Sequence, residues 1–200
     1  MFETRNVAIV VFDDVEVLDF AGPFEVFNVA SEVAPRDPDP PFYVYTVGHT
    51  GGMVRARGGL KIEPSYSITN CPQPDILIVP GGFGTRRLLK NDVLLAWLQD
   101  QRARIQQLLS VCTGSLVLAQ AGLLRDMPAT THHTALHRFE TISPTTTVIA
   151  DQRFVVHGDV VTSGGISAGI DMSLYIVEQL LGADVIAKVK KEMEWGWFQT

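Results

Sequence analysis

Short runs of apolar, mostly β-branched residues alternate along this chain with longer segments in which apolar residues recur every three or four positions. The first pattern is typical of a strand covered on both faces, and the second is typical of a helix. Strands are therefore predicted at residues 6–12, 42–47, 75–79, 107–111 and 160–162, with weaker candidates at 53–57, 60–64, 147–150 and 154–157. Helices are predicted from Pro23 to just before Pro35, and at 85–103, 113–124, 167–181 and 184–195.

This alternation of strands and helices predicts the fold class. It favours an α/β protein in which helices cover both faces of an open, mostly parallel sheet, a three-layer α/β/α sandwich. A chain of 200 residues is long enough for one sizeable core, so we expect a single domain spanning 1–200. Ligands of such sheets bind beyond the carboxyl ends of the strands, where Asp19, Gly81-Gly82, Cys112 and Gly164-Gly165 are expected to meet.

Composition and charge narrow the possible partners. The formal charge is −6, and the 16 Lys and Arg residues form no long basic block, so neither nucleic acid nor an anionic membrane is an expected partner. The apolar stretch 108–124 is interrupted by polar residues and glycines, which fits a buried strand and helix better than a membrane span. The first residues lack the pattern of an export signal, so we expect a cytoplasmic protein whose two cysteines, Cys71 and Cys112, are both thiols.

Cys112 is the main candidate for chemistry. It lies in Ser110-Val111-Cys112-Thr113-Gly114, directly after a predicted buried strand and at the start of a predicted helix. The positive end of a helix dipole favours the thiolate, and the small neighbours resemble the sharp turn that presents a nucleophile. The alternative is a core cysteine that acts as a small apolar residue.

Gly81 and Gly82 end the strand beside that of Cys112. Their backbone N–H groups, with that of Thr113, are candidates for an oxyanion hole that stabilises an anion on bound substrate. The alternative is a tight turn that needs glycine only for its backbone angles.

Asp19 lies in an apolar segment, where burial would raise its pKa and let it donate a proton. Pro23 at the first helical position would make Gly22 the N-cap, which leaves Asp19 too early for capping. His132 follows Cys112 at a distance compatible with a Cys-His pair, and a loop histidine not bonded to the thiol is an equal alternative. No Cys/His cluster has metal-ligand spacing, so no metal is expected.

Five segments together resemble the PfpI/ThiJ superfamily, which has a flavodoxin-like, class I glutamine amidotransferase-like fold, and within it most closely the isonitrile hydratase branch. They are residues 17–23 (VLDFAGP), 80–82 (PGG), 110–118 (SVCTGSLVL), 129–132 (ATTH) and 164–171 (GGISAGID). Most of the superfamily places glutamate beside the thiol, whereas isonitrile hydratases are similar to this chain in having aspartate, at Asp19. The resemblance implies a homodimer, a site supported by Thr113, and hydration of isonitriles to N-substituted formamides without a cofactor.

The same resemblance implies a substrate pocket. Phe20, Phe83 and Ile166 are expected to line an apolar pocket suited to an apolar substituent. Three other functions remain open: a glyoxalase or deglycase using the same thiol, a ligand-sensing module related to the front domain of AraC-type regulators, and a redox sensor based on oxidation of the thiol. In a chain of 200 residues we expect no room for the helix-turn-helix region of such a regulator.

Overall fold

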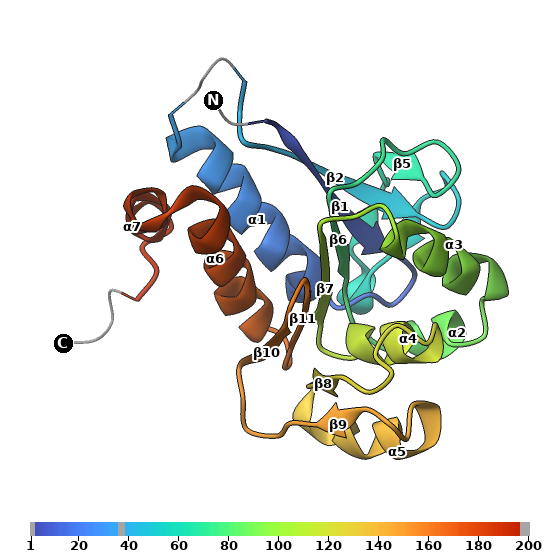
Figure 1. The fold of residues 1–200 in the computed structure, drawn as a ribbon. Helices are drawn as coiled ribbons and strands as arrows, with labels where there is room; N and C mark the ends of the chain where they lie inside the picture. The colour runs from blue at the N-terminus through green and yellow to red at the C-terminus, as the bar shows by residue number, and fades with distance from the viewer. Residues whose placement is uncertain (1–2, 36–38, 197–200) are drawn as a thin grey trace.

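A seven-stranded sheet forms the centre of the computed structural model, which describes residues 3–35 and 39–196 (Figure 1). The strand order is β10-β11-β7-β6-β1-β2-β5, and every neighbouring pair is parallel except β10 with β11. The strands are β1 (Arg5–Val11), β2 (Phe42–Gly48), β5 (Tyr66–Ser67), β6 (Ile76–Val79), β7 (Gln107–Val111), β10 (Phe154–His157) and β11 (Val160–Ser163). The predicted mostly parallel sheet is confirmed.

Helices cover both faces of this sheet, as Figure 1 shows. On one face lie α1 (Val17–Val33), α6 (Ala168–Leu181) and α7 (Ala183–Glu192), and on the other lie α2 (Thr85–Leu88), α3 (Asp92–Arg102) and α4 (Gly114–Gln120). The central strands are consequently buried on both sides, and all four residues of β6 have no exposed surface. This explains why these strands are continuous apolar runs, and it confirms the three-layer α/β/α arrangement.

Smaller elements lie outside the central sheet. The weak strand candidates at 53–57 and 60–64 are shorter than predicted, β3 (Val54–Arg55) and β4 (Lys61–Ile62), and pair with each other around the 3-10 helix η1 (Arg57–Gly59). The candidate at 147–150 is β9 (Thr147–Val148), which pairs with the unpredicted β8 (Pro128–Ala129). The 3-10 helix η2 (His133–Arg138) and α5 (Phe139–Ile142) were also not predicted, since neither contains a full period of apolar residues.

The first helix corrects the prediction for its start. Helix α1 begins at Val17 with Glu16 as its N-cap, so Pro23 lies inside the helix and Asp19 lies in its first turn. Gly22 is explained by packing rather than capping, because a Cβ added there would lie 2.9 Å from Cγ1 of Ile170 in α6. Asp19 is therefore held by a helix and not by a loop.

Two other helices are shorter than predicted. The helix expected at 85–103 is split into α2 and α3, because the side chain of Asn91 accepts a hydrogen bond from the N–H of Leu94 (3.1 Å) and caps a new helix there. The helix expected at 113–124 ends at Gln120, and Gly122 follows with a φ of 76° that ends the helical path. Both changes leave the strand ends that carry Gly81 and Cys112 in place.

Candidate active site

Cys112 directly follows β7 and has a strained backbone. Its φ is 54°, a left-handed conformation that is rare for residues other than glycine. The turn is held at both ends of the residue: the Cys112 N–H donates to the carbonyl oxygens of Ser163 (3.1 Å) and Gly164 (3.0 Å), and its own carbonyl accepts from Oγ1 of Thr131 (2.8 Å). Such strain persists only where the surrounding structure over-determines it, and it concentrates at functional sites.

Two glycines allow this turn to pack against the end of β6. A Cβ on Gly114 would lie 1.9 Å from the carbonyl oxygen of Val79. A Cβ on Gly81 would lie 2.8 Å from the Cβ of Cys112. The loop after β6 therefore touches the loop after β7, and both positions exclude any larger residue.

Asp19 reaches the same place from the first turn of α1. Its side chain is fully buried, and Oδ2 accepts a hydrogen bond from the N–H of Gly81 (3.0 Å). The second oxygen, Oδ1, has no hydrogen-bond partner among residues 3–35 and 39–196. Burial raises the pKa of Asp19 to about 7, and the nearby carboxylate of Glu16 adds to this, while the Gly81 bond opposes it.

The thiol of Cys112 and the carboxyl of Asp19 form a coupled pair. Burial first, and then the negative charge of Asp19, raise the pKa of the Cys112 thiol to about 12. Both shifts disfavour a doubly deprotonated pair, so the pair keeps one proton above neutral pH. This corrects the expectation that the position of Cys112 at the start of a helix favours the thiolate, because burial of the thiol has the larger effect. A thiolate near neutral pH therefore requires that Asp19 takes the proton.

Thr113 links the two loops, and its contacts also correct the predicted oxyanion hole. The N–H of Gly82 donates to Oγ1 of Thr113 (3.1 Å), and the hydroxyl of Thr85 donates to the same oxygen (3.2 Å). Since the N–H of Gly81 is already bonded to Asp19, neither glycine has a free donor for a substrate anion. The backbone N–H and hydroxyl of Thr113 face the thiol, where they act to lower the pKa of Cys112 against the larger effect of burial.

His132 lies beside Cys112 in the lining of a cavity but has no hydrogen bond to it in the described part of the chain. Its Nδ1 accepts from the N–H of Thr134 (3.3 Å), so the proton of the neutral ring is on Nε2. Burial lowers the pKa of His132 and favours this neutral form. Gly165 makes room for the ring, since a Cβ there would lie 2.2 Å from Cδ2 of His132.

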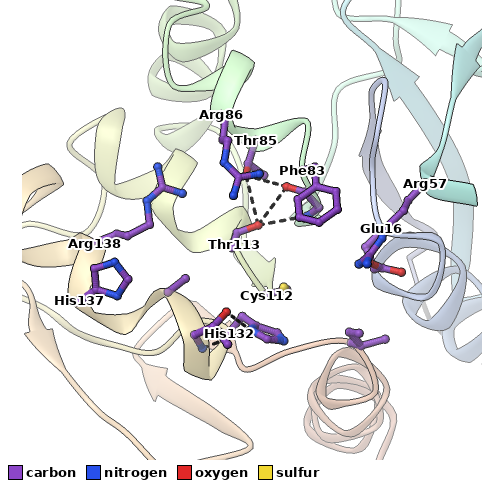
Figure 2. Close-up of a pocket in the computed structure, with 14 residues that line it drawn as sticks. Glu16, Arg57, Phe83, Thr85, Arg86, Cys112, Thr113, His132, His137 and Arg138 are labelled. Carbon is purple, nitrogen blue, oxygen red and sulfur yellow. Dashed lines mark hydrogen bonds and ion pairs between the residues drawn. The ribbon is translucent and has the colours of Figure 1, made fainter.

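The cavity above Cys112 has a volume of about 430 Å³ (Figure 2). As predicted, Phe83 and Ile166 line it, with exposed fractions of 53% and 36%. Phe20 does not line it, because its place on α1 turns its side chain into the core. The full lining is Glu16, Arg57, Gly82, Phe83, Thr85, Arg86, Cys112, Thr113, His132, Thr134, Ala135, His137, Arg138 and Ile166.

This lining corrects the expectation of an apolar pocket, because it includes the three arginines Arg57, Arg86 and Arg138. None of the three was predicted from the sequence, and neither were Glu16, Thr85, Thr134, Ala135 and His137. Most of these residues lie in η1, α2 and η2, which are too short to show the helical repeat of apolar residues. The clustering of three histidines between 132 and 137 is the one sequence signal near them.

The start of α6 lies outside the cavity lining apart from Ile166. Ser167 is the N-cap of α6 and Asp171 lies in its first turn, and the guanidinium of Arg153 contacts both. Within residues 3–35 and 39–196, no three His, Cys, Asp or Glu side chains gather at metal-binding distance. In the same residues no helix has both the length and the apolarity needed to cross a membrane.

The fold and the site define a class of α/β protein in which a cysteine at the turn after a central parallel strand is paired with a buried carboxyl group. Residues 5–179 match the model of the DJ-1/PfpI family, and the chain belongs to this family. The resemblance seen in the sequence motifs is thereby confirmed.

Individual relatives differ in function. The chain is 33% identical to isonitrile hydratase of Pseudomonas putida over 191 residues, which cover 95% of this chain and 78% of that enzyme. It is 27% identical to the HTH-type transcriptional regulator GbdR of Pseudomonas aeruginosa over 187 residues, 94% of this chain and half (50%) of the regulator. Among solved structures, a ThiJ/PfpI family protein from Pseudomonas syringae superposes with a TM-score of 0.87 at 26% identity, covering 98% of this chain and 76% of that one. The fold thus serves both an enzyme and a regulator.

Proposed function

We propose that this protein is a cysteine-dependent hydratase that adds water to isonitriles, R–N≡C, to give N-substituted formamides. The observation that carries the proposal is the pairing of a fully buried carboxyl group, that of Asp19, with the thiol of Cys112, which lines a cavity of about 430 Å³. An isonitrile carbon needs both a nucleophile and a proton at the same atom, and this pair supplies both. The identity to the Pseudomonas putida enzyme supports the same reaction.

The first step forms a bond between sulfur and carbon. With the shared proton on Asp19, Sγ of Cys112 attacks the terminal carbon of R–N≡C, and Asp19 gives its proton to that carbon. The product is the thioimidate R–N=CH–S–Cys112, and Asp19 is left as a carboxylate. Its free oxygen, Oδ1, is the atom available for this transfer, because Oδ2 is bonded to the N–H of Gly81.

The remaining steps release the product. Water adds its oxygen to the thioimidate carbon and a proton to the nitrogen, with the Asp19 carboxylate relaying the proton. The C–S bond then breaks, the hydroxyl proton returns to the pair, and R–NH–CHO leaves. The sum is addition of one water to R–N≡C with no change of oxidation state, so the cycle needs no cofactor.

Two further residues are given supporting roles. The backbone N–H of Thr113 steadies negative charge on the sulfur before attack. His132 acts through its Nε2–H as a hydrogen-bond donor to substrate rather than as the base for the thiol, since its Nδ1 is held by Thr134. Phe83 and Ile166 flank the substituent R in the cavity.

A panel of substrates tests the proposal against its alternatives. Purified protein is expected to convert para-nitrophenyl isocyanide to the formamide, identified by chromatography and mass. Inactivity over a set of aliphatic and aromatic isocyanides would reject the hydratase. Turnover of methylglyoxal alone would favour the glyoxalase, a reaction that the superfamily more typically pairs with glutamate than with an aspartate such as Asp19.

Two non-enzymatic hypotheses, a redox sensor and a ligand sensor, predict different experimental results. Saturating oxidation of Cys112 at low peroxide without any turnover would favour a redox sensor. Tight binding of a small molecule without turnover would favour a ligand sensor, a role suggested by the similarity to the transcriptional regulator GbdR. We also propose a homodimer in the cytoplasm, and light scattering of the purified protein tests its oligomeric state.

A further inference from the structure

The cavity that contains Cys112 is positively charged, although the whole chain carries a formal charge of −6. Its lining includes the guanidinium groups of Arg57, Arg86 and Arg138 and one carboxylate, that of Glu16. A charge of one sign in a cleft raises the local concentration of ligands of the opposite sign. A cavity of this kind is unexpected for a purely apolar substrate.

One of the three arginines is neutralised within the protein. Arg57 pairs with Glu16 at 2.6 Å between Nη1 and Oε2, and its guanidinium lies over the ring of Phe83, 4.5 Å from the centroid. Figure 2 shows this ion pair on one side of Cys112, away from Arg86 and Arg138. The side of the cavity formed by Glu16 and Arg57 therefore carries little net charge.

The other two arginines have no carboxylate partner among the described residues. The Arg86 guanidinium lies 5.2 Å from the ring centroid of Phe83, so an aromatic face orients it but does not neutralise it. Arg138 is half-buried where η2 meets α5, and no hydrogen bond of its guanidinium is found in the described part of the chain. A guanidinium has five N–H donors and matches the geometry of carboxylate and phosphate oxygens.

We propose that the substrate is an anion, an isonitrile whose substituent R ends in a carboxylate or another oxyanion that Arg86 and Arg138 bind. This inference rests on the proposed hydratase function and names its substrate class. The isocyano carbon lies over the sulfur of Cys112, and R extends toward the two arginines, away from the Glu16–Arg57 pair (Figure 2). Negative charge on the substrate is thereby kept apart from Asp19.

Turnover of a matched pair of substrates tests the proposal. Isocyanoacetate and methyl isocyanoacetate differ in one charge and one methyl group. The wild-type protein is expected to favour the anion by about tenfold or more in kcat/KM, and Arg86→Gln or Arg138→Gln is expected to lower this ratio about tenfold, as for loss of one charge-assisted hydrogen bond. Arg138→Lys keeps the charge and should retain part of the preference. Arg125→Gln, an exposed arginine outside the cavity lining, is the matched control and should leave the ratio unchanged.

Alkylation of Cys112 separates this inference from the proposed function. Iodoacetate and iodoacetamide both transfer a two-carbon group to sulfur with loss of iodide, and only the first is an anion. Relative to Cys71 in the same protein, Cys112 should favour iodoacetate, and Arg138→Gln should lower that preference about tenfold. Such a result without turnover of any isonitrile would reject the hydratase and keep the anion site. If the protein turns over isonitriles and the ratio of kcat/KM for isocyanoacetate to that for methyl isocyanoacetate is the same in the wild type and all variants, the hydratase function stands and the anion site is overturned.

Discussion

The base of the cavity and its wall are built in different ways. The base comprises Cys112 and Thr113 in the cavity lining and Asp19 and Gly81 packed behind them, and it is fixed by backbone hydrogen bonds and by contacts too close for any added atom. The wall is formed by Arg57, Arg86 and Arg138 from short helical segments and by Phe83 from the turn before α2, and most of these large side chains are exposed. We propose that the base sets the chemistry and that the wall sets which substrate is accepted.

The largest effect is expected from removing the ionisable group at the base. Asp19→Asn keeps an oxygen for the N–H of Gly81 but cannot carry the proton, so isonitrile turnover should fall roughly a thousandfold. In the wild type, kcat/KM should rise as the pH increases through about 7, where the pair loses its first proton, and the variant should lose this step. Steady-state kinetics from pH 5 to 9 measure both effects.

Asp126→Asn, at an exposed position, is the matched control for this substitution. Its turnover and pH profile should equal those of the wild type. A wild-type rate that is flat from pH 5 to 9 would contradict the coupled pair.

The next effect concerns the close contact under the thiol. Gly114→Ala places a Cβ 1.9 Å from the carbonyl oxygen of Val79, so the turn and β6 must separate. The free energy of unfolding should fall by roughly 3–5 kcal/mol. Gly51→Ala has open space around it and should change stability by less than about 1 kcal/mol. Urea denaturation of both variants provides the comparison, and equal losses would show that the base is less rigid than described.

Asp19 should also make stability depend on pH. Because folding raises its pKa from 3.8 to about 7, the folded protein binds the proton more tightly than the unfolded chain. Protonation of Asp19 therefore contributes stability to the folded protein that is fully present below about pH 4 and is lost as the pH rises to about 7. The free energy of unfolding of Asp19→Asn, measured relative to that of the wild type, should therefore rise by roughly 2–4 kcal/mol between pH 4 and pH 8.

Thermal or urea unfolding at the two pH values tests this difference, and Asp126→Asn should show no comparable gain. A constant difference between Asp19→Asn and the wild type at both pH values would mean that burial does not disfavour the Asp19 carboxylate.

The smallest effect is expected at the edge of the wall. Ile166 is a β-branched residue with a φ of 50°, a conformation that asparagine adopts more easily. Ile166→Asn should therefore stabilise the protein by about 1 kcal/mol. Val148→Asn, at a similarly exposed residue (37% against 36%) without positive φ, should instead destabilise it. Destabilisation by both substitutions would show that the Ile166 side chain contributes packing that outweighs its strain.

Most of the base could be predicted from the sequence because Gly81, Cys112 and Thr113 follow apolar strands. Parallel strands end at one edge, so Gly81 and Cys112 had to approach each other. Asp19 was predicted correctly as a neighbour of the thiol but in the wrong element, since the pattern Gly22-Pro23 is typical of a helix start and here reflects packing against Ile170. The occupied N–H groups of the two glycines depend on tertiary contacts that no local pattern contains.

The wall could not be predicted. Arg86 and Arg138 lie far apart in the sequence, in segments too short to show a period. Whether an arginine is free to bind a ligand depends on which carboxylates lie within reach after folding: Arg57 has Glu16, while among the described residues Arg86 and Arg138 have none. Phe20 and Phe83 show the same limit, because only the fold decides which aromatic ring faces the cavity.

The most direct test of the central claim is to look for the covalent bond between Cys112 and substrate. Rapid acid quench of the wild-type protein during turnover of para-nitrophenyl isocyanide, followed by peptide mass spectrometry, should show the mass of one isocyanide on the peptide that contains Cys112 and none on that of Cys71. Cys112→Ala should form neither the adduct nor the formamide. Formamide produced by Cys112→Ala at the wild-type rate would contradict the account.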